Sequence, residues 1–585
     1  MRSSSFLLFL VLVPGLAWGQ RLGTVDVRGV EGEMADNVRK LLSLNNLPED
    51  ERADPGEARL EYLLRKAPDE VARALEPYGY YETSVTPEIT RRTGRIDVTL
   101  QVSPGEPVVV DTFTNKMDGP GQDDPVVVQT MTNMGPRPGE VLNHARYEAG
   151  KSALQHVLLA RGYFDARMDV HRVEVSRSTH QAAIDLAWRS GSRYRFGETT
   201  FEGAHVRESL LTKSVTYSVG EPYDQDALLK LHQRLTALDY FGYIDVRPDV
   251  EHADEDEVPI VISLMPGKRS VYTAGLSFGT DSGAGIQLGL ERRWLNTRGH
   301  KLKAQLDWAQ RRKSVGLEYR IPAFAISEGW YTVGANRREE ESDVLKTRIT
   351  ELAASRSGAW RGWTLNLGMH MRDEDYVLGS PQDRREGLAL RGRTRLIYPA
   401  LSAQRVVSDD PMYPSRGFSL RGEFKLGAES LGSDVSFGQF LFDAKVIRSF
   451  GASNRILLRG QMGRTIGAGF ERLPPSLRFF AGGDRSIRGY GYQEVGPRVN
   501  GLPTGGRNLL VGSAEYERMF NPSWGAAVFV DAGNAFNEIN DGAAVGAGVG
   551  LRWRSPVGMV RFDVAHGFES DASRFQIHIN IGPDL

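Results

Sequence analysis

The chain has 585 residues, which is too many for one hydrophobic core, so several domains are expected. Its 72 Lys and Arg residues nearly balance its 74 Asp and Glu residues, and the net charge of −2 argues against a nucleic-acid-binding protein. The absence of cysteine excludes disulfides, thiol nucleophiles and cysteine-based zinc sites. The 64 glycines exceed the average usage of about 7%, which indicates many turns and closely spaced strands.

The first residues have the pattern of a secretory signal. Arg2 precedes an apolar run at residues 6–13, and Ala17 and Gly19 supply the small residues of a cleavage site. We expect a signal peptide at residues 1–19, because the run is shorter than the roughly 20 residues of a membrane-spanning helix. Later in the chain no comparable apolar stretch occurs, which leaves two classes: a soluble periplasmic protein or a β-barrel.

A short phrase recurs three times in the first half of the chain. It reads PYGYYETS around Gly79, ARGYFDAR around Gly162 and LDYFGYID around Gly242, at spacings of roughly 80 residues. A helical pattern precedes each phrase, as at residues 228–238, and alternating strands follow, as at residues 260–264. Each unit therefore predicts strand, helix, helix and two strands, a small α+β module in which the aromatic residues are core anchors.

From about Val271 onward, one period-two segment follows another, with Gly, Asn, Asp and Pro between them. The clearest are residues 419–426, 455–462, 526–532, 558–565 and 575–581. This second half, 315 residues long, has room for about 16 antiparallel strands at roughly 20 residues each.

The composition of the strand faces separates a barrel from a soluble sandwich. In residues 545–553 one face is apolar, while the other carries glycines and Arg552. Arg561 and Asp563 likewise share one face of their strand. Unpaired charges in a dry core cost several kcal/mol, so these faces predict a polar lumen inside a transmembrane barrel.

A glycine-rich segment at residues 478–492, RFFAGGDRSIRGYGY, is the densest unusual feature. It lacks the lysine and the helix of a Walker phosphate loop. If it folds into the barrel, Arg488 can reach Asp531 and form a charge-assisted pair, and the loop becomes a latch. Glu515 offers a second acid on a neighbouring strand. The alternative is a solvated loop beside unrelated luminal charges.

Three motifs resemble the signature of the outer-membrane assembly-factor superfamily, which is built from POTRA domains and a 16-stranded barrel. They are GGDRSIRGYGY at 482–492, S-x-E at 513–515 and F-x-D-x-G at 529–533. With three repeats and the closing IGPDL, the chain is similar to the TamA family, the translocation and assembly module subunit. Two departures are Ile487, where the motif often has valine, and an end in Pro-Asp-Leu instead of a terminal aromatic residue.

The resemblance implies that the arginine of the loop packs against acids on neighbouring strands. The implied latch residues are Gly482, Gly483, Arg488, Gly489 and Tyr490, and their implied luminal partners are Glu515, Phe529, Asp531 and Gly533. We place POTRA-like domains at residues 20–107, 108–193 and 194–269, and the barrel at 270–585. The implied location is the Gram-negative outer membrane, with the POTRA domains in the periplasm.

A barrel whose first and last strands pair poorly can open sideways and lend an edge to a nascent strand. The expected seam consists of Tyr272 and Phe278 on the first strand and Phe575, Ile577, Ile579, Ile581 and Gly582 on the last. Pro583, which cannot donate a ladder hydrogen bond, supports a weak seam.

The function expected from the resemblance is insertion and secretion of autotransporter-type outer-membrane proteins, without nucleotide hydrolysis. The implied partners are unfolded clients, outer-membrane lipid and an inner-membrane-anchored TamB-type protein. No enzyme activity, catalytic residue, cofactor or metal is expected, because no G-x-S-x-G or H-E-x-x-H motif occurs. A general barrel insertase, with five repeats, a two-partner secretion pore, with two repeats and a plug helix, and a passive porin remain as alternatives.

Overall fold

The computed structural model describes residues 21–279, 282–324, 328–499, 501–539, 541–555, 558–568 and 575–581. The expected signal peptide and Gly582 lie outside these residues. The chain divides into two compact units: the first contains two small domains, the second contains the large sheet, and a third small domain contributes segments to both. Among the described residues, no helix has the length and the apolar character needed to cross a membrane.

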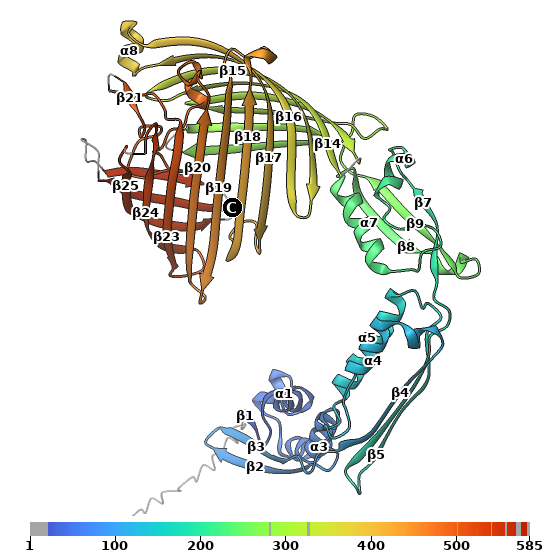
Figure 1. Ribbon diagram of the computed structural model, residues 1–585. Helices are drawn as coiled ribbons and strands as arrows, with labels where there is room; N and C mark the ends of the chain where they lie inside the picture. The colour runs from blue at the N-terminus through green and yellow to red at the C-terminus, as the bar shows by residue number, and fades with distance from the viewer. Residues whose placement is uncertain are drawn as a thin grey trace, which may run out of the picture. The chain divides into compact units, whose positions relative to one another are not determined.

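The three small domains share one topology, with helices packed beside a three-stranded sheet (Figure 1). The first comprises β1 (Arg21–Arg28), α1 (Gly32–Leu41), α2 (Glu49–Ala53), α3 (Glu57–Leu75), β2 (Ser84–Arg92) and β3 (Arg95–Ser103). The second comprises β4 (Val109–Asp118), α4 (Pro125–Asn133), α5 (His144–Ala160), β5 (Arg167–Ser176) and β6 (Gln181–Arg189). The third comprises β7 (Arg195–Glu202), α6 (Glu208–Leu211), α7 (Gln225–Ala237), β8 (Phe241–Pro248) and β9 (Glu257–Pro266).

In each sheet the last strand of the domain lies in the centre, in the orders β1-β3-β2, β4-β6-β5 and β7-β9-β8. Alternate residues of that central strand are buried under the helices, as Ile260, Ile262 and Leu264 are on β9. Leu231 and Leu235, one turn apart on α7, are fully buried as well. The α+β modules predicted from the repeat are therefore confirmed.

The repeated phrase marks the point where a helix ends in a left-handed residue. Gly79 and Gly162 occupy this position, with φ of 86° and 87°. In the third domain the position belongs to Asp239, with φ of 56°, whereas Gly242 lies inside β8. The alignment on Gly242 was therefore wrong by three residues, because Asp can also adopt this conformation. The aromatic residues that follow, Tyr163 and Tyr240, are buried core residues as predicted.

The second half of the chain forms one 16-stranded antiparallel sheet, as predicted, and curls into a nearly closed barrel (Figure 1). The strands are β10 (Ser270–Gly279), β11 (Gly283–Arg292), β12 (Lys301–Ala309), β13 (Arg312–Ala323), β14 (Gly329–Glu341), β15 (Leu345–Trp360), β16 (Trp363–Leu378), β17 (Leu390–Ser408), β18 (Arg416–Gly427), β19 (Phe437–Phe450), β20 (Asn454–Ile466), β23 (Asn508–Met519), β24 (Trp524–Phe536), β25 (Ala544–Ser555), β26 (Gly558–Gly567) and β27 (Phe575–Ile581). A short helix, α8 (Pro381–Glu386), connects β16 and β17.

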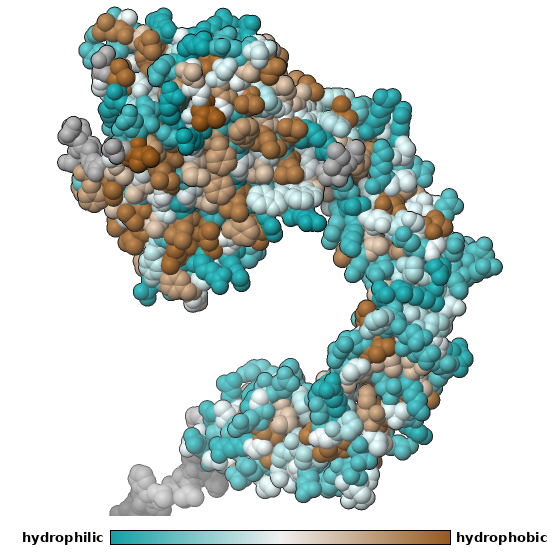
Figure 2. Space-filling view, in the orientation of Figure 1, coloured by the Kyte–Doolittle hydropathy of each residue, from teal (hydrophilic) through white to brown (hydrophobic). Residues whose placement is uncertain are grey.

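The outside of the barrel is apolar and the inside is polar, as the period-two pattern predicted. Val549, Leu551 and Trp553 of β25 are exposed on the outer face, whereas Arg552 on the inner face is fully buried. Figure 2 shows apolar side chains gathered over the barrel strands, with hydrophilic side chains along the upper margin. An apolar outer band with a polar interior is the arrangement that a lipid bilayer requires.

Candidate functional site: a loop held inside the barrel

The loop that joins β20 to β23, residues 467–507, folds back into the barrel, and we call it the inner loop. It contains two 3₁₀ turns (Phe470–Arg472 and Pro475–Leu477) and a two-residue hairpin of β21 (Arg498–Val499) and β22 (Leu502–Pro503). Its apolar side chains form a cluster with the inner face of the wall. This cluster includes Phe479, Ala481, Ile487, Tyr490, Leu509, Val511, Ala535 and Ala544. The inner loop is therefore a packed element and not a solvated one.

Arg488, at the tip of the inner loop, contacts three carboxylates. Its Nε and Nη2 donate to the two oxygens of Asp531 at 2.8 and 3.0 Å, a bidentate pair. Its Nη1 donates to Glu515 at 2.7 Å and to Asp563 at 3.0 Å. Its backbone N–H also donates to Asp531, at 3.0 Å. The guanidinium lies 3.4 Å from the ring centroid of Phe529, so the inner loop tip is held by hydrogen bonds, charge and stacking together.

Glycines on the wall make room for the tip. A Cβ atom on Gly546 would lie 1.9 Å from the carbonyl oxygen of Arg488. A Cβ on Gly567 would lie 2.9 Å from the carbonyl oxygen of Gly489 and from the ring of Tyr490. The hydroxyl of Tyr490 donates to the carbonyl of Val545 at 3.2 Å. The sequence predicted that the glycine-bearing face of β25 lines a polar lumen. In the structure this face also leaves the space in which the inner loop packs.

The remaining glycines of the predicted site permit backbone conformations and close backbone contacts that other residues rarely allow. Gly482, Gly483 and Gly489 have φ of 98°, 104° and 96°, which other L residues rarely adopt. A Cβ on Gly533 would lie 2.2 Å from the carbonyl oxygen of Leu510, so this glycine permits a close approach of β24 to β23. The structure therefore brings the predicted latch residues and their predicted partners into one site.

A second buried arginine, Arg552, belongs to the same site, although the sequence did not predict that it shares the carboxylates of Arg488. Arg552 donates to Glu517 at 2.8 Å, to Glu515 at 2.5 Å and to Asp563 at 2.5 Å. It therefore shares two of its carboxylates with Arg488. The sequence did place Arg552 and Asp563 on luminal faces, but a period of two residues says nothing about which charges meet across strands.

The buried ion pairs extend from Arg552 toward the end of the barrel at which β10 begins. Arg455 donates to Glu517 through Nε at 2.5 Å and to the carbonyl of Pro414 through Nη1 at 3.0 Å. Pro414 lies in the turn between β17 and β18, and the neighbouring Tyr413 ring lies 3.8 Å from Arg455 and 3.2 Å from Arg554. The ion network is the set Arg455, Arg488, Arg552, Glu515, Glu517, Asp531 and Asp563.

The ion network is almost wholly withdrawn from solvent, and Asp531, Glu517 and Arg552 have no exposed surface at all. Removing one partner from a buried ion pair leaves an uncompensated charge and costs about 3–5 kcal/mol. Each arginine of the network is therefore tied to the stability of the barrel as well as to the position of the inner loop.

The sheet has a seam between its first and last strands. Among the described residues no ladder joins β10 to β27, although their Cα atoms come within 8 Å. Leu276 on β10 is 89% exposed, whereas Ile286, its ladder partner on β11, is 46% exposed because strands flank it on both sides. On β27, Phe575 is 73% exposed. The other predicted seam residues, Tyr272, Phe278, Ile577, Ile579 and Ile581, lie on these two strands.

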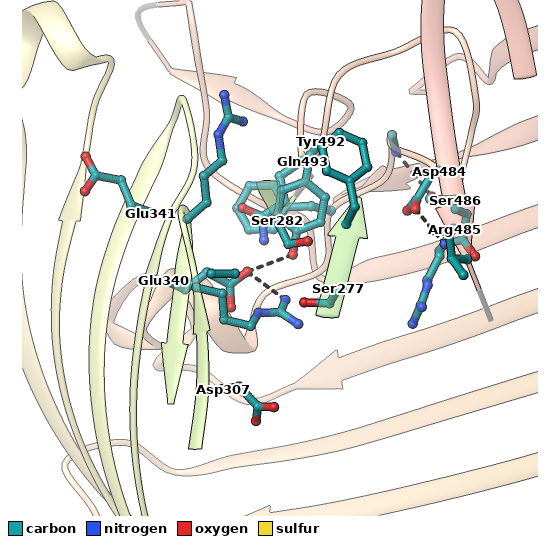
Figure 3. Close-up of a pocket in the computed structure, with 18 of the residues that line it drawn as sticks. Ser277, Ser282, Asp307, Glu340, Glu341, Asp484, Arg485, Ser486, Tyr492 and Gln493 are labelled. Atoms are coloured by element: carbon teal, nitrogen blue, oxygen red, sulfur yellow. Dashed lines mark hydrogen bonds and ion pairs between the residues drawn. The ribbon is translucent and has the colours of Figure 1, made fainter. Parts of the chain in front are cut away.

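Two luminal cavities, of about 770 and 540 Å³, lie beside the inner loop and share Asp484, Arg485 and Asn580 in their walls. Figure 3 shows the larger one, with Asp484 and Arg485 of the inner loop facing Glu340 and Asp307 of the wall. Leu276 and Ser277 both line it, although consecutive strand residues point to opposite faces. The cavity therefore reaches around the free edge of β10.

Comparison with protein families gives three matches. Residues 295–584 match the Omp85 superfamily domain, residues 24–104 match the POTRA domain TamA domain 1, and residues 194–267 match the POTRA family described as surface antigen variable number repeat.

Two curated relatives are described as outer membrane protein assembly factor BamA. That of Nitratidesulfovibrio vulgaris is 23% identical over 431 residues, which cover 71% of this chain and 53% of the relative. That of Neorickettsia risticii is 23% identical over 455 residues, which cover 73% of this chain and 60% of the relative. The chain thus spans little more than half the length of the relatives it matches.

A solved structure, BamA from Haemophilus ducreyi lacking POTRA domains 1–3, is similar in fold. It has a TM-score of 0.69 at 16% identity and covers 81% of this chain and 99% of that chain. At this identity the likeness concerns the fold, a barrel preceded by small domains.

Proposed function

We propose that this chain, which belongs to the Omp85 superfamily and carries a TamA-type first POTRA domain, assembles outer-membrane proteins by lending the edge of its seam to client strands. The barrel lies in the outer membrane and the POTRA domains lie in the periplasm. Assembly factors of this superfamily are not enzymes. The free energy comes from the client, because strand pairing satisfies backbone groups that lipid leaves bare.

The observation that carries the proposal is the seam between β10 and β27. Each of these strands has a ladder partner on one side only, within the part of the chain that the structure describes. An edge strand of this kind is a template for another chain. Within the residues that the structure describes, β27 has seven residues and is the shortest strand of the sheet.

The inner loop supports the proposal by its position. Arg488 fixes the loop tip against β23, β24 and β26, beside the cavities that reach the seam. We call the seam a gate when β10 and β27 separate, and we propose that the inner loop is the latch of this gate. Its ion network ties the loop tip to β23, β24 and β26, the strands that lead up to β27, so that these strands stay in place while β10 and β27 separate.

For the clients and partners, we propose autotransporter-type outer-membrane proteins and a TamB-type protein that binds the POTRA region. The TamA match of the first POTRA domain supports this choice. General barrel insertion is a second candidate, which the two relatives described as BamA favour. Strains that depend on this chain distinguish the two: loss of autotransporter display alone supports the first, and loss of porins as well supports the second.

The latch is tested with Arg488→Ala and Arg488→Lys. Lysine keeps the charge but not the bidentate geometry, so we expect client display to fall most with alanine and less with lysine. The matched control is Arg485→Ala, because Arg485, three residues earlier in the inner loop, makes no ion pair to any described residue. Normal display by correctly inserted Arg488→Ala contradicts the latch.

An exchange of Arg488 with Asp531 is not a suitable rescue. Arg488 meets three carboxylates, so an aspartate at position 488 would face Glu515 and Asp563 even if an arginine stood at position 531. Like charges at these distances destabilise the buried site. The conservative lysine variant is therefore the sharper comparison.

A further inference from the structure

The inner face of β27 is bound to the inner loop as well as to β26. Gln576, His578 and Asn580 point into the lumen, opposite to the outward residues of the same strand. The side-chain amide of Asn580 donates to Asp484 at 3.0 Å. The backbone N–H of Gly489 donates to Nε2 of His578 at 3.2 Å. Two of the three luminal residues of the last strand thus contact the inner loop.

Both contacts are specific in geometry. Asn580 accepts from Arg561 of β26 at 3.3 Å with its oxygen, which fixes its amide nitrogen toward Asp484. His578 is only 4% exposed, and because its Nε2 accepts a hydrogen bond, its ring carries the proton on Nδ1. Gly489 follows Arg488 directly, so the residue that the ion network holds is adjacent to the one that binds the last strand.

We propose that these four residues, Asp484, Gly489, His578 and Asn580, form a seam clasp that keeps β27 in the closed position until a client strand arrives. The inference rests on the proposed function and deepens it, because it names the positioning residues of the gate. Among the described residues, β27 has a ladder partner on one edge only, whereas a strand inside the sheet has one on each edge. The clasp adds contacts from the inner face of β27, which help to hold this strand in place.

The clasp sets how readily the gate opens. The clasp contributes two hydrogen bonds, far fewer than the ladder that joins two neighbouring strands of the sheet. They can therefore break while Arg488 stays bound to its three carboxylates. Opening of the seam and release of the inner loop are thus separate events, with separate residues in control.

The test measures the distance across the seam directly. The chain has no cysteine, so Leu276→Cys and Ile577→Cys provide the only labelling sites for a spin-label pair, on the outer faces of β10 and β27. In the otherwise unchanged protein, reconstituted in liposomes, we expect one narrow distance distribution. Asn580→Asp places a second carboxylate beside Asp484, and we expect the distribution to broaden and move outward by about one strand spacing, roughly 5 Å.

Restoration separates the clasp from a general loss of structure. Combining Asn580→Asp with Asp484→Asn exchanges donor and acceptor and keeps the contact with Arg561, so the narrow distribution should return. The control is Gln576→Ala, since Gln576 lies on the same face of β27 and makes no side-chain hydrogen bond to a described residue. An unchanged distribution in Asn580→Asp, or no restoration in the double variant, overturns the clasp.

The readout also distinguishes the clasp from the proposed function. If the seam widens in Asn580→Asp and narrows again in the double variant, the clasp is supported whatever the client does. A further variant has its seam closed by an engineered disulfide between β10 and β27. If client assembly proceeds normally in all variants, including this one, the proposal that clients use the seam is contradicted while the clasp is still supported. If the seam distance does not respond, the clasp fails while assembly through the seam is untouched.

Discussion

Gly546→Ala tests whether the inner loop is seated against the wall without changing any charge. A Cβ at this position lies 1.9 Å from the carbonyl oxygen of Arg488, and real Cβ contacts almost never fall below 3.0 Å. The tip must therefore move by about 1.1 Å. A displacement of this size lengthens the hydrogen bonds of 2.8 and 3.0 Å to Asp531 beyond the range of a hydrogen bond.

The magnitude follows from the cost of overpacking. Inserting a methyl group into a well-packed site costs about 1–3 kcal/mol. Because 1.4 kcal/mol is a factor of ten in an equilibrium constant, the released state of the inner loop should become about tenfold more populated or more. The matched control is Gly512→Ala on β23, where an added Cβ meets no atom within 4 Å.

A single thiol reports the release. Ile487 has no exposed surface when the inner loop packs against the wall, so a cysteine at this position is buried. Because the chain has no cysteine of its own, Ile487→Cys supplies the one thiol that can react. We expect a membrane-impermeant maleimide to label this position about tenfold faster in Gly546→Ala than in the reporter alone. Equal labelling rates in Gly546→Ala and Gly512→Ala would refute the seating of Arg488 against β25.

Two further predictions concern other parts of the chain. Glu517→Ala leaves Arg455 and Arg552 without their shared carboxylate and should lower barrel stability by about 3–5 kcal/mol, visible as a lower temperature at which the folded band disappears on a heat-modifiability gel. An unchanged temperature would mean that the barrel does not depend on this part of the network. In the second small domain, burial acts to raise the pKa of Asp124, but hydrogen bonds from the Val126 amide and Arg161 outweigh it and hold the pKa below its usual 3.8. Its stabilisation of α4 is therefore complete above about pH 4 and lost as the pH falls through the lowered pKa, so Asp124→Asn should show weaker hydrogen-exchange protection of α4 near neutral pH and a flatter acid dependence than the wild type.

The architecture was predictable because it depends on periodicity. In the second half, the period of two residues predicted strands with a polar lumen, the length of that half predicted about 16 of them, and the repeat in the first half predicted three α+β modules. The alignment of the third module failed because Asp239 performs the left-handed turn that glycine performs in the first two. A search for glycine does not find this position in the third module, whereas the left-handed backbone conformation identifies it in all three.

The site was only partly predictable. Arg488, Glu515 and Asp531 stand in recognisable motifs, so a pair between them was a reasonable hypothesis. Arg552 and Glu517 stand in ordinary strand sequence, and only the register of β23 against β24 and of β24 against β25 brings their side chains together. Glycines of β25 were read for polarity, and their role as space for Arg488 needed the position of the inner loop.

The placement of the inner loop also constrains the biogenesis of this chain itself. Arg488 and Gly489 find their partners up to 89 residues later in the sequence, on strands β23 to β27. During synthesis the loop emerges before its seat exists, and closing contacts over such separations is slow. Until β26 has been made, Arg488 lacks one of its three carboxylates, and until β27 has been made, the backbone N–H of Gly489 lacks its acceptor. The inner loop can therefore be fully seated only after the last strand of the sheet has been made.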